Sequence, residues 1–195
     1  MSKNSNLKRA VFIDRDGTMN VDVGYVSSPD QLEVYPWTGQ AVRLINESGL
    51  LAIVVSNQSG VARGFCSEQT LELIHERLML HLEQDGARLD ALYYCPHHPE
   101  IGDAPYRRRC DCRKPQPGML HRAATLHDID LARSFVIGDK ASDIALAKNA
   151  RARSVLVLTG YGQETLANPD VWPCEPDAVC DNLLEAVNYI VSSEF

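Results

Sequence analysis

Short apolar runs alternate with amphipathic segments along most of this chain. Five runs are nearly continuous in aliphatic residues, at residues 10–14, 50–57, 91–95, 134–139 and 154–160. Their shortness and their β-branched residues predict strands that are buried on both faces of a sheet. Helical patterns occur between and after them, at residues 39–48, 67–85, 118–127, 141–149 and 181–191. This alternation predicts an α/β fold with a doubly wound parallel sheet.

Two irregular stretches interrupt the alternation, at residues 17–36 and 95–117. Each directly follows a predicted strand, so both should lie at the carboxyl edge of the sheet, where open α/β sheets bind ligands. Neither stretch is long enough for a separate cap domain, and the chain shows no repeat or linker. We therefore predict a single domain over residues 1–195, in which these two loops shape a fairly open pocket.

Composition and charge narrow the possible partners. The 195 residues include 45% hydrophobic residues and carry a formal net charge of −7, which favours a soluble domain with no nucleic-acid partner. No apolar run approaches membrane-spanning length, and residues 1–9 are polar and lack the apolar core of a signal peptide. We predict a cytoplasmic protein with no membrane partner. Since no apolar helix is left over for an interface, we also predict a monomer.

Two carboxylates stand at the end of the first predicted strand. Asp14 and Asp16 frame Arg15 and are followed by Gly17. Aspartate is depleted in strands, and a buried, unpaired carboxylate is costly. A solvated turn rich in aspartate and glycine would explain the pair equally well on these residues alone.

The other predicted strands also end in polar residues. Ser56 closes the second strand, Lys114 follows the third, and Asp139 follows the fourth, with Asp143 close behind. Singly, Lys114 could be a solvated surface lysine and Asp143 a first-turn helix carboxylate. Together with the first pair they supply a nucleophile, a proton donor, a hydroxyl, a cation and metal-binding carboxylates, which is a set suited to phosphoryl transfer.

At this point the chain closely resembles the haloacid dehalogenase-like (HAD-like) phosphatase superfamily. The resemblance rests on DxDGT at residues 14–18, Ser56, Lys114 and GDKxxD at residues 138–143. It implies that Asp14 attacks phosphorus and forms an aspartyl phosphate. Asp16 would protonate the leaving alkoxide and then activate water.

The same resemblance implies a magnesium site and a phosphate site. Asp14, the backbone carbonyl of Asp16 and the side chain of Asp139 would hold Mg²⁺, with Asp143 in support. Ser56 would bond the phosphoryl oxygens, together with the backbone amide of the next residue, and Lys114 would neutralise charge in the transition state.

Three cysteines and a histidine form a second candidate metal site. Cys95 and His97 are followed by Cys110 and Cys112, which could make a closed Cys₃His zinc site. Buried free thiols are the alternative. The segment between the two pairs is polar and proline-rich and cannot form its own core, so we predict that Zn²⁺ fixes this loop, over about residues 95–112.

This loop narrows the resemblance to two families of zinc-containing phosphatases. The CPH motif at residue 95 and CxCRKP at residue 110 resemble heptose-bisphosphate phosphatases and histidinol-phosphate phosphatases. NQSGVARG at residues 57–64 and NVDVGY at residues 20–25 resemble the heptose family. That likeness implies Zn²⁺ on Cys95, His97, Cys110 and Cys112, without His98.

The heptose family resemblance also implies a substrate and its contacts. The substrate would be a small phosphorylated sugar that loses its 7-phosphate, in the synthesis of nucleotide-activated heptose for lipopolysaccharide. The implied contact residues are Asp22, Val23, Gly24, Tyr25, Ser56, Asn57, Gln58, Ser59, Arg113, Lys114 and Lys140. Histidinol phosphate is the alternative, but its positive charge fits poorly with the basic residues at 107–114. A non-catalytic zinc module is a further alternative, which the complete catalytic set disfavours.

Overall fold

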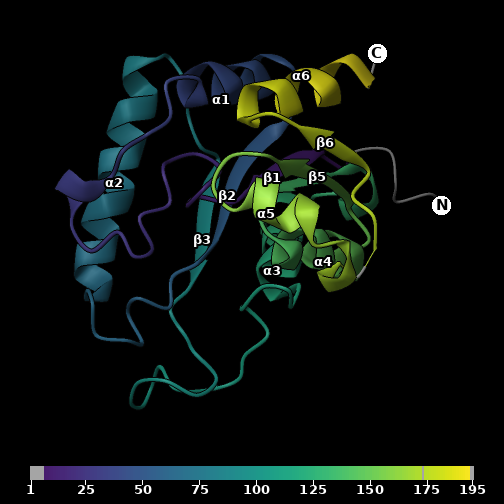
Figure 1. The fold of residues 1–195 in the computed structure, drawn as a ribbon. Coiled ribbons are helices and arrows are strands. Elements are labelled where there is room, and N and C mark those ends of the chain that lie inside the picture. The colour runs from purple at the N-terminus through teal and green to yellow at the C-terminus, as the bar shows by residue number, and fades with distance from the viewer. Residues whose placement is uncertain (1–6, 173, 194–195) are drawn as a thin grey trace.

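The computed structural model describes residues 7–172 and 174–193. The first six residues of the predicted polar N-terminal segment therefore lie outside the described part. A six-stranded parallel sheet in the order β3-β2-β1-β4-β5-β6 forms the centre of the molecule (Figure 1). Its strands are β1 (Ala10–Ile13), β2 (Leu51–Asn57), β3 (Ala91–Cys95), β4 (Phe135–Gly138), β5 (Arg153–Val157) and β6 (Ala178–Cys180). The predicted α/β class is confirmed.

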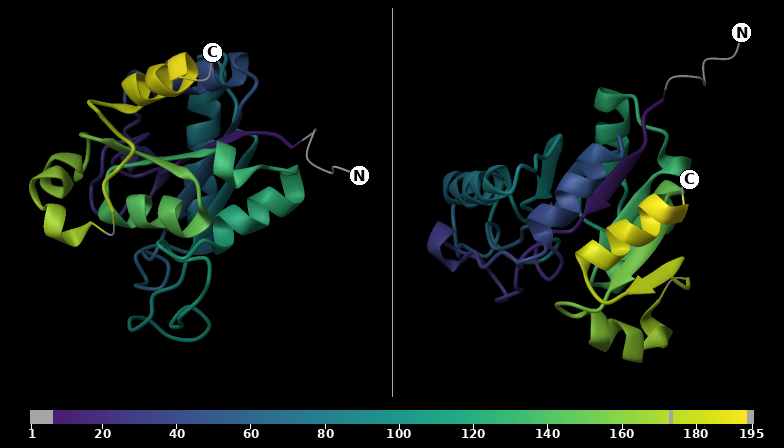
Figure 2. Two further views of the ribbon diagram at one scale, coloured as in Figure 1. Left: turned by 90° about the vertical axis from the view of Figure 1, so that its right-hand side faces the viewer. Right: turned by 90° about the horizontal axis from the view of Figure 1, so that it is seen from above.

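Helices cover both faces of the sheet (Figure 2, left). They are α1 (Thr38–Glu47), α2 (Glu68–Gln84), α3 (Gly118–His127), α4 (Ala141–Ala150), α5 (Gly162–Ala167) and α6 (Leu183–Ser193). Successive strand residues point to opposite faces, so Val11 and Ile13 of β1 pack with α1 and α6, whereas Ala10 and Phe12 pack with α3 and α4. β1 is completely buried between these two cores.

The predicted strands all form, but one strand and one α-helix were missed. β6 has three residues at the sheet edge, and α5 has six. Elements this short bury too few side chains to produce a visible apolar period. The fifth strand also ends at Val157, three residues before the predicted end, because the chain turns there to bring Thr159 and Gly160 to the sheet edge.

The loops at the carboxyl edge are tied to the sheet rather than forming a separate lobe. Backbone bonds join Val21 to Glu33 and Tyr35 to Met19, and the loop at residues 95–117 extends beyond the strand ends (Figure 1). No separate cap is evident in the described residues. Within them, no helix combines the length and apolar content needed to cross a membrane.

Candidate active site

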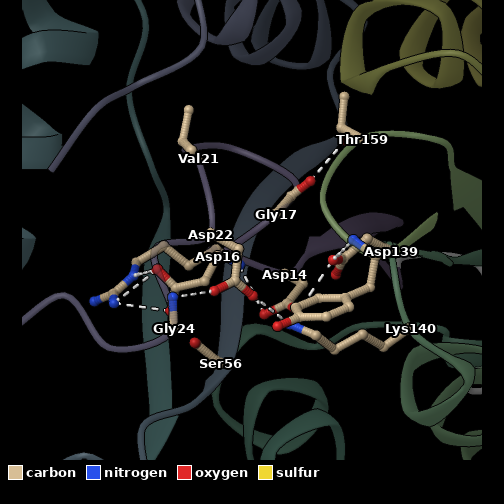
Figure 3. A network of polar contacts seen from close by, with 12 residues as sticks. Asp14, Asp16, Gly17, Val21, Asp22, Gly24, Ser56, Asp139, Lys140 and Thr159 are labelled. Atoms are coloured by element: carbon tan, nitrogen blue, oxygen red, sulfur yellow. Dashed lines mark hydrogen bonds and ion pairs between the residues drawn. The ribbon is translucent and has the colours of Figure 1, made fainter. Parts of the chain in front are cut away.

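The polar residues predicted from separate strand ends meet at one edge of the sheet (Figure 3). Asp14 follows β1, Ser56 is near the end of β2, and Asp139 follows β4. β1 is hydrogen-bonded to both β2 and β4, and parallel strands present their carboxyl ends at the same edge. The topology therefore gathers residues that are more than 120 positions apart, such as Asp14 and Asp139.

Lys114 is buried in this site and is not a surface lysine. Its Nζ lies 2.8 Å from Asp14 Oδ1 and 2.7 Å from Asp143 Oδ1, and it donates to Val55 O at 3.1 Å. Burial opposes its charge, but the carboxylates of Asp14 and Asp143 outweigh that effect and raise the pKa of Lys114. The ammonium group is thus fixed beside the carboxylate of Asp14.

Asn57 holds the Lys114 backbone in place. The Lys114 N–H donates to Asn57 Oδ1 at 2.9 Å, and Asn57 Nδ2 donates to Lys114 O at 3.2 Å. This reciprocal pair joins the end of β2 to the loop that follows the cysteine cluster. The sequence resemblance implied only a ligand contact for Asn57, so this bridging contact is a structural finding.

Three buried carboxylates surround a position suited to a cation. Asp14, Asp139 and Asp143 each offer an oxygen, and these atoms lie within 4.8 Å of one another. Burial raises the pKa of Asp14 to about 6 in spite of Lys114, and burial together with the charge of Asp14 raises that of Asp139 to about 7. Carboxyl pKa values raised in this way indicate a site with uncompensated negative charge.

The surroundings of Asp139 support the same conclusion. Its Oδ1 is buried without a hydrogen-bond partner, whereas Oδ2 accepts from Tyr161 N at 2.8 Å. A Cβ atom on Gly17 would overlap the Asp139 carboxylate, so only glycine permits this approach. A hard cation with oxygen ligands fits the set, and Mg²⁺ is such an ion.

Asp16 is held away from this cluster by a separate network. Arg15 donates to it from Nε at 3.0 Å and from Nη2 at 2.9 Å, and Gln58 Nε2 donates to its Oδ2 at 2.7 Å. Asn20 Nδ2 adds a bond of 3.0 Å. Burial alone would raise the pKa of Asp16, but the charge of Arg15 and these bonds outweigh it and lower the pKa. Asp16 is therefore ionised in this arrangement.

Arg15 belongs to this site, although it was not among the residues predicted from the sequence. Its side chain is 0% exposed although it is large and charged. Nη2 also donates to Gln58 Oε1 at 3.1 Å, so Arg15 orients both Gln58 and Asp16. The available signal was its position between two carboxylates, where a buried cation is needed.

The loops predicted to contact substrate border the carboxylate cluster. Lys140 Nζ pairs with Asp22 Oδ2 at 2.8 Å and lies 3.7 Å from Asp139 Oδ2. Asp22 Oδ1 in turn accepts from Gly24 N at 2.7 Å. Val23 and Tyr25 are about half exposed at the rim (52% and 42%).

The predicted residues on the β2 side are nearly inaccessible. Ser56, Gln58 and Ser59 are buried, and Gln58 Nε2 donates to Ser56 Oγ at 2.7 Å. Arg113 lies beside the cysteine loop, where its Nη1 donates to His97 O at 3.2 Å.

The predicted Cys₃His set comes together as a compact cluster. The sulfur of Cys95 lies 3.5 Å from that of Cys110 and 3.3 Å from that of Cys112, and the Cys110–Cys112 sulfurs are 3.3 Å apart. The fourth atom is Nδ1 of His97, at 3.4 Å from Cys112 Sγ and 3.6 Å from Cys95 Sγ. Zinc bonds of about 2.3 Å place tetrahedral sulfurs nearly as far apart. The cluster suits Zn²⁺, as predicted.

The cluster also excludes the neighbouring histidine. His98 Nδ1 accepts hydrogen bonds from the backbone N–H groups of Glu100 at 3.1 Å and of Ile101 at 3.0 Å. These bonds stabilise the loop conformation and occupy the Nδ1 atom of the ring.

Burial raises the pKa values of Cys95 and Cys112, and a bound cation would lower them. None of the six cysteines forms a disulfide bond within the described residues, and Cys66, Cys174 and Cys180 lie outside the cluster.

Comparisons with known proteins agree with this geometry. A family model described as HAD-hydrolase-like matches residues 111–186. The chain is 40% identical to D-glycero-beta-D-manno-heptose-1,7-bisphosphate 7-phosphatase of Haemophilus ducreyi over 94% of this chain and 98% of that protein. It is 44% identical to the enzyme of the same name from Escherichia coli K12, over 77% and 80%.

A solved structure shows the same fold at full length. D,D-heptose 1,7-bisphosphate phosphatase from B. bronchiseptica, complexed with magnesium and phosphate, superposes with a TM-score of 0.85 at 34% identity, covering 95% of this chain and 99% of that one.

Proposed function

The chain belongs to the D-glycero-D-manno-heptose-1,7-bisphosphate 7-phosphatase family of HAD-like hydrolases, and we propose from this premise that it removes the 7-phosphate from D-glycero-D-manno-heptose 1,7-bisphosphate. The observation that carries the chemistry is the buried triad in which Lys114 bridges Asp14 and Asp143. It places a fixed cation beside the candidate nucleophile, in a pocket that also has oxygen ligands for Mg²⁺.

Asp14 is the nucleophile of this proposal. Its carboxylate attacks phosphorus, the phosphate–sugar oxygen bond breaks, and an aspartyl phosphate forms on Asp14. Lys114 and Ser56 bind the phosphoryl oxygens as charge develops on them. Asp14, Asp139 and the Asp16 carbonyl would hold Mg²⁺, with Asp143 in support, and the bound ion would offset repulsion between the anionic nucleophile and phosphate.

Asp16 completes the proposed cycle in two protonation states. Protonated, it gives its proton to the leaving sugar oxygen; ionised, it takes a proton from the water that hydrolyses the aspartyl phosphate. The network of Arg15, Asn20 and Gln58 stabilises the ionised state. The first step therefore requires Asp16 to take up a proton and loosen these bonds.

We expect Gln58→Met to move the pH dependence of the reaction. Removing the 2.7 Å bond from Gln58 Nε2 destabilises the ionised form of Asp16, so the pKa of Asp16 rises. Since the proton is needed in the first step, the alkaline limb of the kcat/KM profile should shift to higher pH. The exposed Gln116→Met variant is the control. If Gln58→Met lowers the rate but the alkaline limb does not shift, Gln58 does not control the pKa of Asp16 and its role is substrate binding.

The substrate assignment is tested by phosphate release with magnesium. We expect both anomers of heptose 1,7-bisphosphate to exceed histidinol phosphate in kcat/KM, by about 100-fold for the preferred anomer. The position of the remaining phosphate, read by NMR, should be C1. Preference for histidinol phosphate would replace the substrate while leaving the Asp14 chemistry in place, and loss of the 1-phosphate first would contradict the regiochemistry.

The proposal also includes the location of the enzyme in the cell and its oligomeric state. The enzyme is cytoplasmic, acts as a monomeric single domain, and serves nucleotide-activated heptose synthesis for lipopolysaccharide. Sedimentation at micromolar concentration should give the 21.6 kDa mass of one chain.

A further inference from the structure

Two hydrogen-bond donors face each other beside the proposed substrate pocket. Arg63 follows β2, His98 lies in the cysteine loop, and Arg63 Nη2 is 3.3 Å from His98 Nε2. His98 Nδ1 accepts from two backbone N–H groups, so the ring hydrogen is on Nε2. A guanidinium group has no acceptor. The contact therefore joins two donors, and an acceptor placed against both would satisfy them.

The surroundings of the Arg63–His98 pair lack a carboxylate partner. No aspartate or glutamate in the described residues lies within ion-pair distance of Arg63, His98 or Arg113. Arg63 Nε is buried without a hydrogen-bond partner. Arg113 donates to the carbonyl of His97, directly before His98, so a second guanidinium group lies near the pair. Two guanidinium groups without an ion-pair partner favour an anionic ligand.

A chain of contacts connects this pair to the catalytic carboxylates. The Arg63 guanidinium lies 5.5 Å above the Tyr25 ring, and that ring packs against Phe65 at 4.8 Å. Tyr25 belongs to the same loop as Asp22, which pairs with Lys140 beside Asp139. The pair therefore contacts the same loop that borders the carboxylate cluster.

We propose that Arg63 and His98, with Arg113 alongside, bind the second phosphate group of a bisphosphorylated sugar. This inference rests on the proposed function and assigns residues to the phosphate that is not cleaved. A phosphate oxygen accepts from both donors at once, and a guanidinium group can make two parallel bonds to phosphate. Arg63, His98 and Phe65 were not among the predicted substrate contacts.

The test compares bisphosphate with monophosphate in matched variants. Arg63→Ala removes the guanidinium group. His98→Asn keeps an acceptor for the Glu100 and Ile101 N–H groups but removes the Nε2 donor. Arg107→Ala is the control, because it removes an equal charge from an exposed arginine of the same loop. Zinc content and thermal unfolding show whether each variant is folded.

We expect Arg63→Ala to lower kcat/KM for heptose 1,7-bisphosphate by roughly 10- to 100-fold, mainly through KM, because a charge-assisted bond is lost. For heptose 7-phosphate the change should stay within about threefold, as for Arg107→Ala on both substrates. His98→Asn should likewise lower kcat/KM for heptose 1,7-bisphosphate more than kcat/KM for heptose 7-phosphate. An equal loss on both substrates, or an equal effect of Arg107→Ala, would overturn the assignment.

A second substrate pair separates this inference from the proposed function. Fructose 1,6-bisphosphate and fructose 6-phosphate differ by the same group without the heptose. Suppose that the wild-type enzyme does not hydrolyse heptose bisphosphate but prefers fructose 1,6-bisphosphate to fructose 6-phosphate, and that Arg63→Ala abolishes this preference. That result overturns the proposed function and leaves the anion site in place. A wild type without bisphosphate preference on either pair overturns the anion site.

Discussion

Asp14→Asn should reduce magnesium-dependent phosphate release by a factor on the order of 10⁴ or more, the scale seen when a covalent nucleophile is removed. The amide is nearly the same size but is neutral and a poor nucleophile, so the aspartyl phosphate cannot form. The measurement is single-turnover release of phosphate with saturating enzyme. The exposed Asp30→Asn variant, which loses the same charge outside the site, should keep wild-type activity.

Stability provides the control for folding. In the metal-free protein the pKa of Asp14 is raised to about 6, above its unfolded value, so the carboxyl group stabilises the fold at low pH and this contribution is lost as pH rises through 6. At pH 8 the ionised group is a net cost, and Lys114 keeps Asp143 as a partner. Asp14→Asn should therefore not lower the free energy of unfolding of metal-free protein. If Asp14→Asn is inactive because it is unfolded, its loss of activity does not support Asp14 as the nucleophile. If the folded variant is active, Asp14 is not the nucleophile.

The fold could be predicted because its central strands are buried on both faces. Burial of β1 from Ala10 to Ile13 demands an uninterrupted apolar run, and the first charge after such a run marks the sheet edge. That rule places Asp14 and Asp139 at the site without any knowledge of tertiary contacts. It fails for β6, where two residues are partly buried and Val179 is exposed, so no apolar run is required.

The contacts inside the site could not be predicted in the same way. Sequence favours an exposed Arg15 and an exposed Lys114, since these residue types are seldom buried. Lys114 is buried because the carboxylates of Asp14 and Asp143, which are distant from it in the sequence, compensate its charge, whereas Arg15 is compensated by the adjacent Asp16. Asn57 also hydrogen-bonds to the backbone of Lys114, 57 positions later in the chain. The sequence does not show that these two residues are in contact.

Zinc removal should have the second largest effect, because in the proposed mechanism the cysteine cluster positions Lys114, a residue that stabilises the transition state, from outside the site. Cys112 is followed directly by Arg113 and Lys114, and the loop at residues 95–117 has little apolar core of its own. We expect Cys110→Ser to lower the free energy of unfolding by roughly 2–5 kcal/mol, comparable to losing a covalent cross-link. The measurement is chemical denaturation together with metal content.

The same variant should lower kcat/KM by roughly 100-fold, because displacement of Lys114 from Asp14 weakens charge compensation in the transition state. Two internal tests separate this from general damage. Cys180→Ser changes a thiol on β6, outside the cluster, and should retain zinc and activity. Cys110→Ser should still bind Mg²⁺, since Asp14, Asp139 and Asp143 are held by β1, β4 and α4 rather than by the loop. If zinc-free protein kept both its stability and its kcat/KM, the cluster would be independent of the active site, and the Asn57–Lys114 bridge alone would suffice to hold the lysine in place.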